Sequence, residues 1–387
     1  MASDPRLDRR ALLGALGAGA SGALAGCALP GGGGDDGDGD ELDIPAFSEF
    51  RGSGPLASGR PQPEGTRIEE LPDLSGTLRI YLGGGEGGIY EDFTRTLEEI
   101  YPDFEAKIDR GGSSSLAQSV VSEVEADNPQ ADVFWSIDAG SLAHVAENDA
   151  AESLSADVVD PVPSSFRGPD DTWVGVAGRA RSVPYNTNQL SAADVPTTVQ
   201  EFPDTTALQG TMGWAPTYGA FKAFVTAMRL LRGADATRKW LVAMREADTT
   251  RYPNEAVVSN RVADGALAAG FANHYYAMRV KEARPDAPID LAFTESDAGA
   301  LVNVAGALRL AGSGNRDLAE AFVRHLLTAE AQEFFATVAY AYPMIPGVAP
   351  VGGLPTIDEL QPPDVDLSAL SDLEPTLEVM REAGVEG

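Results

Sequence analysis

An alternation of short apolar strands with amphipathic helices is the sequence feature that most constrains this fold. Residues 78–82 alternate in polarity as a strand does, residues 83–88 form a glycine-rich turn, and residues 89–100 carry apolar side chains at helical spacing. A second helix pattern at 116–125 and a short apolar strand at 131–135 continue the alternation. Alternating elements of this kind predict an α/β fold with mixed sheets flanked by helices.

The length of the chain, 387 residues, predicts more than one lobe, because a single hydrophobic core stops growing at about 250–300 residues. Two long extended runs, 173–188 and 300–308, have the length of hinge strands that cross between two lobes. The predicted division of the folded part is lobe 1 (76–180 and 295–335), lobe 2 (181–294) and a C-terminal helical segment that packs on the lobes (336–387).

The charge of the chain excludes one large class of partners. Acidic residues number 59 against 28 basic ones, which gives a formal net charge of −31. A surface of this charge repels nucleic acid and anionic membranes. Only four of the basic residues are lysines, and the acidic residues are spread through every segment. This pattern favours a halophilic, archaeal source, in which high salt screens the self-repulsion.

Residues 1–26 have the order of an export signal. Arg9 and Arg10 precede an apolar Gly/Ala-rich stretch, which ends in Leu-Ala-Gly-Cys at residues 24–27. The paired arginines predict twin-arginine (Tat) export, and the last four residues resemble the lipobox of lipoproteins, in which Cys27 receives a lipid. The alternative is a short buried helix with an inert thiol. We expect a lipid anchor on the extracellular face of the cell membrane, with residues 27–75 as a disordered, acidic, Gly/Pro-rich tether.

Two adjacent phenols, Tyr275 and Tyr276, follow Asn273 and His274 and form the most distinctive polar motif of the folded part. Adjacent tyrosines more often serve packing, and no common metal-ligand spacing includes them. A phenolate does suit Fe(III), however, because a small and highly charged ion favours hard anionic oxygen donors. By itself, the motif leaves packing and metal binding open.

Enzyme motifs are absent from the sequence. The single cysteine, Cys27, belongs to the predicted signal, no Gly-x-Ser-x-Gly elbow occurs, and the three histidines lack zinc spacing. The glycine-rich turn at 83–88 has neither the dinucleotide fingerprint nor a Gly-Lys-Ser/Thr ending. We therefore expect a binding protein rather than an enzyme.

Six groups of residues occur in an order that matches a known family. They are Gly178-Arg179-Ala180-Arg181 with Tyr185-Asn186, Gly213-Trp214-Ala215-Pro216-Thr217, Tyr252-Pro253-Asn254, Asn273-His274-Tyr275-Tyr276, Val302-Asn303-Val304-Ala305-Gly306 and Tyr342-Pro343. On these motifs the chain resembles the ferric-ion-binding extracellular solute-binding proteins of iron(III) ABC transporters, over residues 76–349. The tyrosine motif is the most specific part of the resemblance.

The resemblance implies a type II periplasmic-binding-protein fold, in which two α/β lobes joined by crossing strands close on the ligand. It also implies a membrane permease and an ATPase as partners of a monomer. Tyr275 and Tyr276 are then expected to bind Fe(3+) as phenolates. Some members of the family add a third tyrosine, whose position falls on Tyr218 here. Other members bind a small synergistic anion such as carbonate, which implicates Ala220 and Asn273 here.

The first lobe departs from the family pattern. Family members often place a histidine, or a histidine and a tyrosine, after the first strand, where this chain has Gly-Gly-Gly-Glu-Gly-Gly, followed by Tyr90. Glu86 is the only ionic candidate there, so we predict it as a metal ligand, with a solvated acid at a helix start as the alternative. Some members supply a glutamate after the second strand, and Asp138 stands one residue away from that position.

Several other polar residues leave two interpretations open. Tyr218 either binds the metal or packs on the helix that it precedes. Arg179 and Arg181 either form an ion-pair network or hold a carbonate or phenolate by charge-assisted hydrogen bonds. His274 is interpreted as a structural neighbour of the tyrosines. His144 and His325 are interpreted as surface or packing residues.

The sequence thus predicts an extracellular, membrane-anchored solute-binding protein that captures ferric iron through tyrosine phenolates and delivers it to an ABC permease. Two alternatives stay open. One is a solute-binding protein for an organic or phosphorylated anion, held by Arg181, by Ser113, Ser114 and Ser115, and by helix N-termini. The other is an extracellular lyase or hydrolase on the same scaffold, because a fold does not fix a function.

Overall fold

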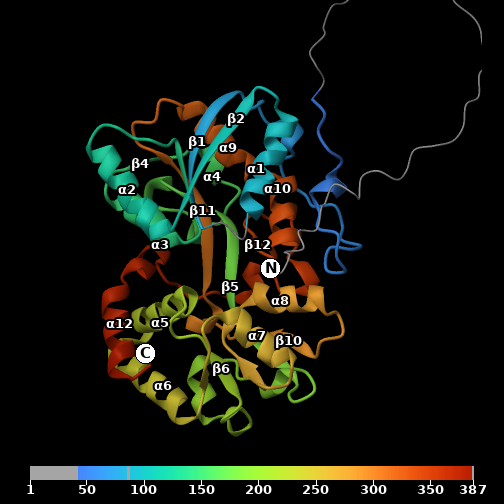
Figure 1. Ribbon diagram of the computed structural model, residues 1–387, viewed down its shortest axis with the longest axis vertical. Coiled ribbons are helices and arrows are strands. Elements are labelled where there is room, and N and C mark those ends of the chain that lie inside the picture. Colours follow the sequence, from blue (N-terminus) through green and yellow to red (C-terminus); the bar gives the residue numbers. More distant parts are fainter. Residues whose placement is uncertain (1–41, 85–87, 386–387) are drawn as a thin grey trace, which may run out of the picture. The chain divides into compact units, whose positions relative to one another are not determined.

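The computed structural model describes residues 42–84 and 88–385 of the chain. The predicted export signal, the lipid site Cys27 and the candidate ligand Glu86 lie outside the described residues. From residue 42 on, two groups of strands and helices are joined by long strands (Figure 1). Each helix in the described part of the chain is too short or too polar to cross a membrane.

Three parallel strands form one side of the lobe 1 sheet: β1 (Gly76–Gly83), β2 (Phe104–Gly111) and β3 (Val133–Ser136). β1 lies between the other two, because Ile80 pairs with Ile108 of β2 and with Val133 of β3. Ile80 and Val133 are fully buried, as expected for parallel strands covered by helices. The predicted strand at 78–82 is confirmed, and it extends by residues at both ends.

Helices flank this sheet: α1 (Ile89–Ile100), α2 (Ser113–Glu125), α3 (Ala139–Glu147), α4 (Ala156–Val159), α9 (Arg316–His325) and α10 (Ala329–Phe334). α1 has the predicted bounds and buries Phe93, Leu97 and Ile100 along one side. α2 begins at Ser113, three residues before the predicted start, because the serines after Gly112 already have helical geometry. The mixed sheet with flanking helices agrees with the predicted fold class.

Two antiparallel strands, β5 (Val174–Asn186) and β11 (Val302–Leu310), run between the lobes (Figure 1). β11 pairs with β3 and with the short strand β4 (Ala151–Glu152) in lobe 1. The first half of β5 pairs with β11, and its second half pairs with strands of lobe 2. β5 therefore belongs to the sheets of both lobes, which is the property expected of a hinge strand.

The sheet of lobe 2 is assembled on the second half of β5. Its strands are β6 (Met212–Trp214), β7 (Thr250–Arg251), β8 (Ala269–Gly270), β9 (Ala272–Asn273) and β10 (Ile289–Ala292). β6 runs parallel to β7 and β8, whereas β8, β9 and β10 pair with β5 in the antiparallel sense. Four helices complete the lobe: α5 (Gly219–Arg232), α6 (Ala234–Glu246), α7 (Glu255–Ala263) and α8 (His274–Ala283).

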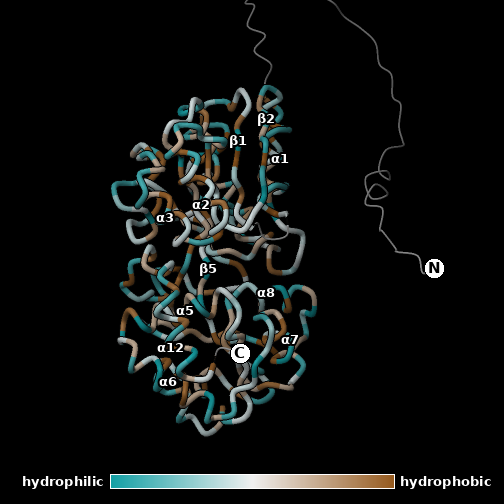
Figure 2. The backbone as a smooth tube through the Cα atoms, turned by 60° about the vertical axis from the view of Figure 1, so that its left-hand side comes forward, coloured by the Kyte–Doolittle hydropathy of each residue, from teal (hydrophilic) through white to brown (hydrophobic). Residues whose placement is uncertain are grey.

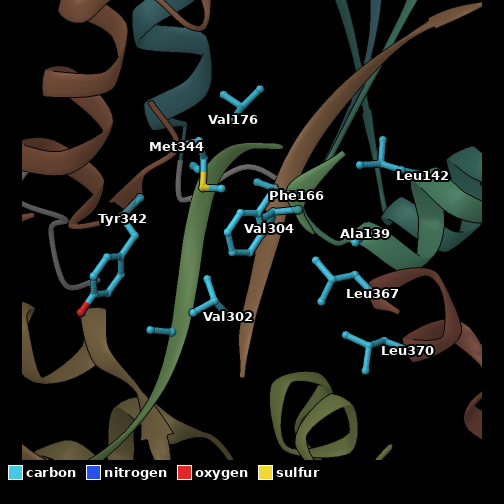
Figure 3. Close-up of a cluster of buried hydrophobic side chains, with 14 of the residues drawn as sticks. Ala139, Leu142, Phe166, Val176, Val302, Val304, Tyr342, Met344, Leu367 and Leu370 are labelled. Carbon is cyan, nitrogen blue, oxygen red and sulfur yellow. The ribbon is translucent and has the colours of Figure 1, made fainter. Parts of the chain in front are cut away.

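The main hydrophobic core is continuous from lobe 1 through the crossing strands into lobe 2. At the crossing, this core includes Val176 of β5, Val304 of β11, Met344, Leu142 and Leu370 (Figure 3). Along the backbone, the hydrophilic stretches lie mostly in outer loops and on outer helix faces (Figure 2). A smaller cluster fills the space around α7 and α8.

Residues 42–75 differ from the predicted tether, because they pack on lobe 1, and the Leu56 N–H also donates a hydrogen bond to Glu282 of α8 in lobe 2 at 3.4 Å. Phe50, Ile68 and Leu74 are buried in the main core. The spacing of these three residues gives no helix or strand pattern. The helical elements of residues 42–75 are two short 3-10 turns, Phe47–Phe50 and Ile68–Glu70. Three arginines of the segment also form ion pairs with α10: Arg51 and Arg60 with Glu333, and Arg67 with Glu330.

The C-terminal segment contacts both lobes. α10 continues into a π-helical turn, Phe335–Ala339, and a two-residue strand, β12 (Tyr342–Pro343), then pairs with β5. A 3-10 turn, Leu367–Ser371, packs against α3 of lobe 1. The approach is so close that any side chain at Gly140 would place its Cβ only 2.9 Å from the Ser371 Cβ. The last helix, α12 (Leu373–Glu382), packs on α5 and α6 of lobe 2.

Candidate functional site

A cavity of about 630 Å³ lies between the two lobes, beside the crossing strands. We call its two walls the lobe 1 face and the lobe 2 face. The lobe 1 face consists of Ser114, Ala117, Gln118, Ile137, Asp138, Gly140, Ser141 and His144. The lobe 2 face consists of Arg181, Tyr218, Gly219, Ala220, Ala223, Asn273 and Tyr275. The crossing strands and the C-terminal segment contribute the rest: Arg179, Leu301 and Asn303, and Leu370, Ser371 and Leu373.

The tyrosine pair occupies the first turn of α8. Asn273, the last residue of β9, is also the N-cap of this helix, so the chain turns from the sheet edge directly into Tyr275 and Tyr276. Tyr275 is buried and lines the cavity, and the Asn273 side-chain amide donates a hydrogen bond to its hydroxyl at 3.2 Å. The rings of the two tyrosines lie 4.4 Å apart between centroids.

Tyr218 joins this pair from the start of another helix. It is the N-cap of α5, and its hydroxyl is hydrogen-bonded to that of Tyr276. Tyr276 is not among the cavity-lining residues and reaches the group through this contact. The predicted tyrosine pair and the more distant Tyr218 are thus brought together at the lobe 2 face.

The crowding of the phenols affects their ionisation. Burial is the largest cause that raises the pKa of Tyr276 above its ordinary value, and the neighbouring Tyr275 and Tyr218 raise it further. The only cation that the structure places over these rings is Arg279, whose guanidinium carbon lies 5.1 Å from the Tyr275 centroid and 5.9 Å from that of Tyr276. Tyr276 therefore keeps its proton until a stronger positive charge arrives.

Arg181 is the buried cation of the lobe 2 face, with 3% of its surface exposed. Its Nη1 atom donates hydrogen bonds to the carboxylate of Glu255 and to Asn273 Oδ1, the latter at 3.1 Å. The other Glu255 oxygen accepts a hydrogen bond from the Asn273 backbone N–H at 2.8 Å. This network connects β5, α7 and β9, and it fixes the start of the tyrosine helix.

The second terminal nitrogen of Arg181, Nη2, is buried without a hydrogen-bond partner. The guanidinium carbon lies 5.3 Å from the centroid of the Phe224 ring, so the arginine also packs on an aromatic face. A buried donor without an acceptor destabilises the fold by about 1–3 kcal/mol. The start of α5 lies on the same face: Gly219 and Ala220 line the cavity, and the Tyr218 side chain makes no capping hydrogen bond. Uncapped backbone N–H groups at a helix start bind anions.

The lobe 1 face offers different chemistry. Asp138 is the N-cap of α3, and its two carboxylate oxygens accept from the Ser141 N–H at 2.8 Å and the Ser141 hydroxyl at 3.1 Å. The candidate ligand Asp138 is therefore engaged within its own helix. Among the residues that the structure describes, no three His, Cys, Asp or Glu side chains gather as a metal site.

The histidines have distinct positions. His274 is fully buried, and its ring nitrogens face the Ala180 carbonyl at 3.3 Å and the Tyr340 carbonyl at 2.6 Å. His325 is buried against the Tyr101 hydroxyl at 3.0 Å. His144 lies on the lobe 1 face of the cavity, a position that was not predicted from the sequence. The spacing of Asp138, Ser141 and His144 at every third residue was the one sequence signal that could have indicated this position.

Comparisons with known proteins identify the family of this chain. Residues 90–360 match a family model described as bacterial extracellular solute-binding protein. The major ferric iron-binding protein of Neisseria meningitidis is 31% identical over 269 residues, which cover 67% of this chain and 80% of that protein. The Fe(3+)-binding periplasmic protein of Serratia marcescens is 29% identical over 279 residues, covering 71% of this chain and 81% of that protein.

Solved structures extend the comparison to the fold. Iron-bound HitA from Pseudomonas aeruginosa superposes with a TM-score of 0.68 at 27% identity, covering 80% of this chain and 99% of HitA. A Trichodesmium protein (IdiA, FutA) in complex with iron and citrate superposes with a TM-score of 0.66 at 21% identity, covering 80% and 99%. This chain therefore belongs to the family of periplasmic and extracellular solute-binding proteins that includes the ferric-iron-binding proteins.

Proposed function

We propose that this protein captures ferric iron through the phenolates of Tyr218, Tyr275 and Tyr276 and delivers it to an ABC permease driven by its ATPase. The observation that carries the proposal is the meeting of three phenol groups from the starts of α5 and α8 beside the interlobe cavity. Packing alone does not require the hydroxyls of neighbouring tyrosines to converge.

The chemistry of the donors matches the cargo. Fe(III) favours hard anionic oxygen ligands, and three phenolates balance its charge of +3. A phenol has an ordinary pKa of about 10, so binding must displace the protons, which the ion can do as the largest local charge. The raised pKa of Tyr276 makes this displacement harder and couples iron binding to proton release.

A synergistic anion such as carbonate is expected beside the iron. Arg181 is the cation of the lobe 2 face, and the N–H groups at Gly219 and Ala220 belong to an uncapped helix start. These residues line the same cavity face as Asn273 and Tyr275. An anion there would bridge these donors and the metal by charge-assisted hydrogen bonds.

The location of the site also suits a solute-binding protein. The cavity lies between lobes joined by β5 and β11, and closure about these strands would bury the cargo. Delivery to a permease is expected at the extracellular membrane face, with Cys27 carrying the lipid anchor after Tat export and the protein acting as a monomer. No catalytic role is required of any residue in this proposal.

One observation favours a second candidate. The cavity of about 630 Å³ is much larger than an iron ion and falls within the range of small organic ligands, about 300–1,000 Å³. An organic or phosphorylated anion could occupy it, held by Arg181 and the helix start. In that case the phenols would line the site as hydrogen-bond donors rather than as metal ligands.

A titration with ferric citrate separates the two candidates. If the phenolates bind iron, the protein will develop a broad visible band from phenolate-to-iron charge transfer. The band will disappear in the Tyr275→Phe, Tyr276→Phe double variant. A colourless protein whose melting temperature rises with organic phosphates at high salt, and not with ferric citrate, would favour the organic anion.

A further inference from the structure

The two faces of the cavity differ in the metal ligands that they can supply. The lobe 2 face brings two phenols, Tyr218 and Tyr275, with Tyr276 hydrogen-bonded behind Tyr218. Among the described residues of the lobe 1 face the only carboxylate is Asp138, and both of its oxygens accept hydrogen bonds from Ser141 at the start of α3. The other described polar side chains of that face are Ser114, Gln118 and Ser141, which are poor ligands for Fe(III). Within the described residues, one side chain of the lobe 1 face is left to consider.

That side chain is His144. It lies on α3 three residues after Ser141 and six after Asp138, is half-buried, and lines the cavity with both of them. Its backbone carbonyl accepts a hydrogen bond from Asn148, while its ring makes no hydrogen bond or ion pair with any described residue. The other two histidines, by contrast, have both ring nitrogens facing protein atoms.

We propose that His144 is the lobe 1 ligand of the bound iron, with an imidazole nitrogen coordinating the metal when the lobes close. This inference rests on the proposed function. Imidazole nitrogen is a suitable ligand for iron. A neutral imidazole also adds no further negative charge to a buried site that already holds three phenolates and an anion.

The fold provides the movement that this coordination requires. α3 packs on β11 in lobe 1, whereas α5 and α8, which carry the phenols, belong to lobe 2. β5 and β11 join the lobes, and Arg179 and Asn303, paired across these strands, lie at the wall of the cavity. Closure about this point carries His144 toward the phenols. Iron is therefore held first by lobe 2 and then sealed by lobe 1.

The test compares His144→Ala and His144→Gln with Glu147→Gln, an exposed position on the same helix that is outside the cavity lining. Protein labelled with ¹⁵N-histidine is loaded with Fe(III) and studied by pulsed electron paramagnetic resonance. We expect a ¹⁵N coupling to iron in the parent protein and in Glu147→Gln, and its loss in both His144 variants. In competition with citrate, the His144 variants should bind iron at least about tenfold more weakly, while the charge-transfer band persists.

Each other outcome overturns the inference. A coupling that persists without His144 assigns the nitrogen ligand to another residue. Weaker binding in the variants, combined with no ¹⁵N coupling in the parent, makes His144 a hydrogen-bond donor to the anion rather than a metal ligand. If the charge-transfer band develops and all three variants bind iron equally, only the assignment of His144 fails. If no band develops in the parent, the proposed function fails and this inference with it.

Discussion

The two faces of the cavity are built in opposite ways. The lobe 2 face is assembled before any ligand arrives: Arg181, Glu255 and Asn273 form a buried network that fixes the start of the tyrosine helix. Among its described residues, the lobe 1 face carries hydroxyl, amide and imidazole groups and a single engaged carboxylate. On the proposed function, lobe 2 would therefore provide the affinity for the cargo, and lobe 1 would provide the closing contacts.

The largest effect is expected when the phenols of lobe 2 are removed. We predict that Tyr275→Phe with Tyr276→Phe weakens ferric iron binding on the order of a thousandfold, because each lost ligand reduces affinity by at least about tenfold to a hundredfold. Competition with citrate at fixed pH measures the change. Tyr252→Phe, a tyrosine outside the cavity lining, is the control and should bind as the parent does. Comparable losses in both proteins would mean that the affinity does not come from the lobe 2 face.

The second effect concerns the buried network. Arg181→Met leaves the fully buried Glu255 without its cation, and breaking a buried pair in this way reduces the free energy of unfolding by about 3–5 kcal/mol. Changing Glu255→Met as well should restore much of that stability, because no unpaired charge is then left. Chemical unfolding of the iron-free proteins at high salt measures both.

A measurement of iron affinity with and without carbonate separates the stabilising role of Arg181 from its proposed role in binding the anion. We expect the double variant, although refolded to near-parent stability, to lose any dependence of iron affinity on carbonate. A double variant that still responds to carbonate would place the anion away from Arg181.

The pH dependence of iron binding tests the ionisation of the lobe 2 face. The pKa of Tyr276 is raised, chiefly by burial, so the phenol is protonated in the iron-free protein at neutral pH. Binding therefore releases protons, and affinity must rise with pH and fall on acidification, by about tenfold per pH unit for each proton released. Calorimetry in buffers of different ionisation enthalpy counts these protons directly. Binding that releases no proton would mean that the phenols do not ionise.

The smallest effect is expected on lobe 1. Asp138→Ala removes the N-cap of α3, which reduces the free energy of unfolding by about 1 kcal/mol, and it should leave iron affinity nearly unchanged. Asp138→Asn, which keeps a capping oxygen, is the matched control for stability. A large loss of iron binding in both variants would show that this carboxylate leaves its helix to bind the metal.

Local patterns were enough to predict much of lobe 1. The strand at 76–83 and the helix at 89–100 follow from polarity alternation and helical spacing alone, because each element contacts its sequence neighbours. The segment at 42–75 was predicted as a tether, and its packing was missed, because Phe50, Ile68 and Leu74 have no period. Contacts between distant segments leave no such local signal.

The site shows the same division. The resemblance to iron-binding proteins indicated Tyr218, Tyr275 and Tyr276. Their local sequence does not show that Tyr218 contacts Tyr276, because 58 positions separate the two residues. The partner of Arg181 was not predicted either, because Glu255 is 74 positions away and acidic residues are abundant. His144 was interpreted as a surface or packing residue, since a lone histidine on a helix has many possible surroundings.

Resonance Raman spectroscopy of the iron-loaded protein, excited in its visible band, addresses the role of the lobe 2 phenols most directly. If these phenols hold the cargo, the spectrum will contain ring vibrations of tyrosinate bound to iron. The signal will saturate at one iron per chain and will disappear in the Tyr275→Phe, Tyr276→Phe variant. Iron that binds without tyrosinate vibrations, or vibrations that survive in the variant, would contradict the proposed function.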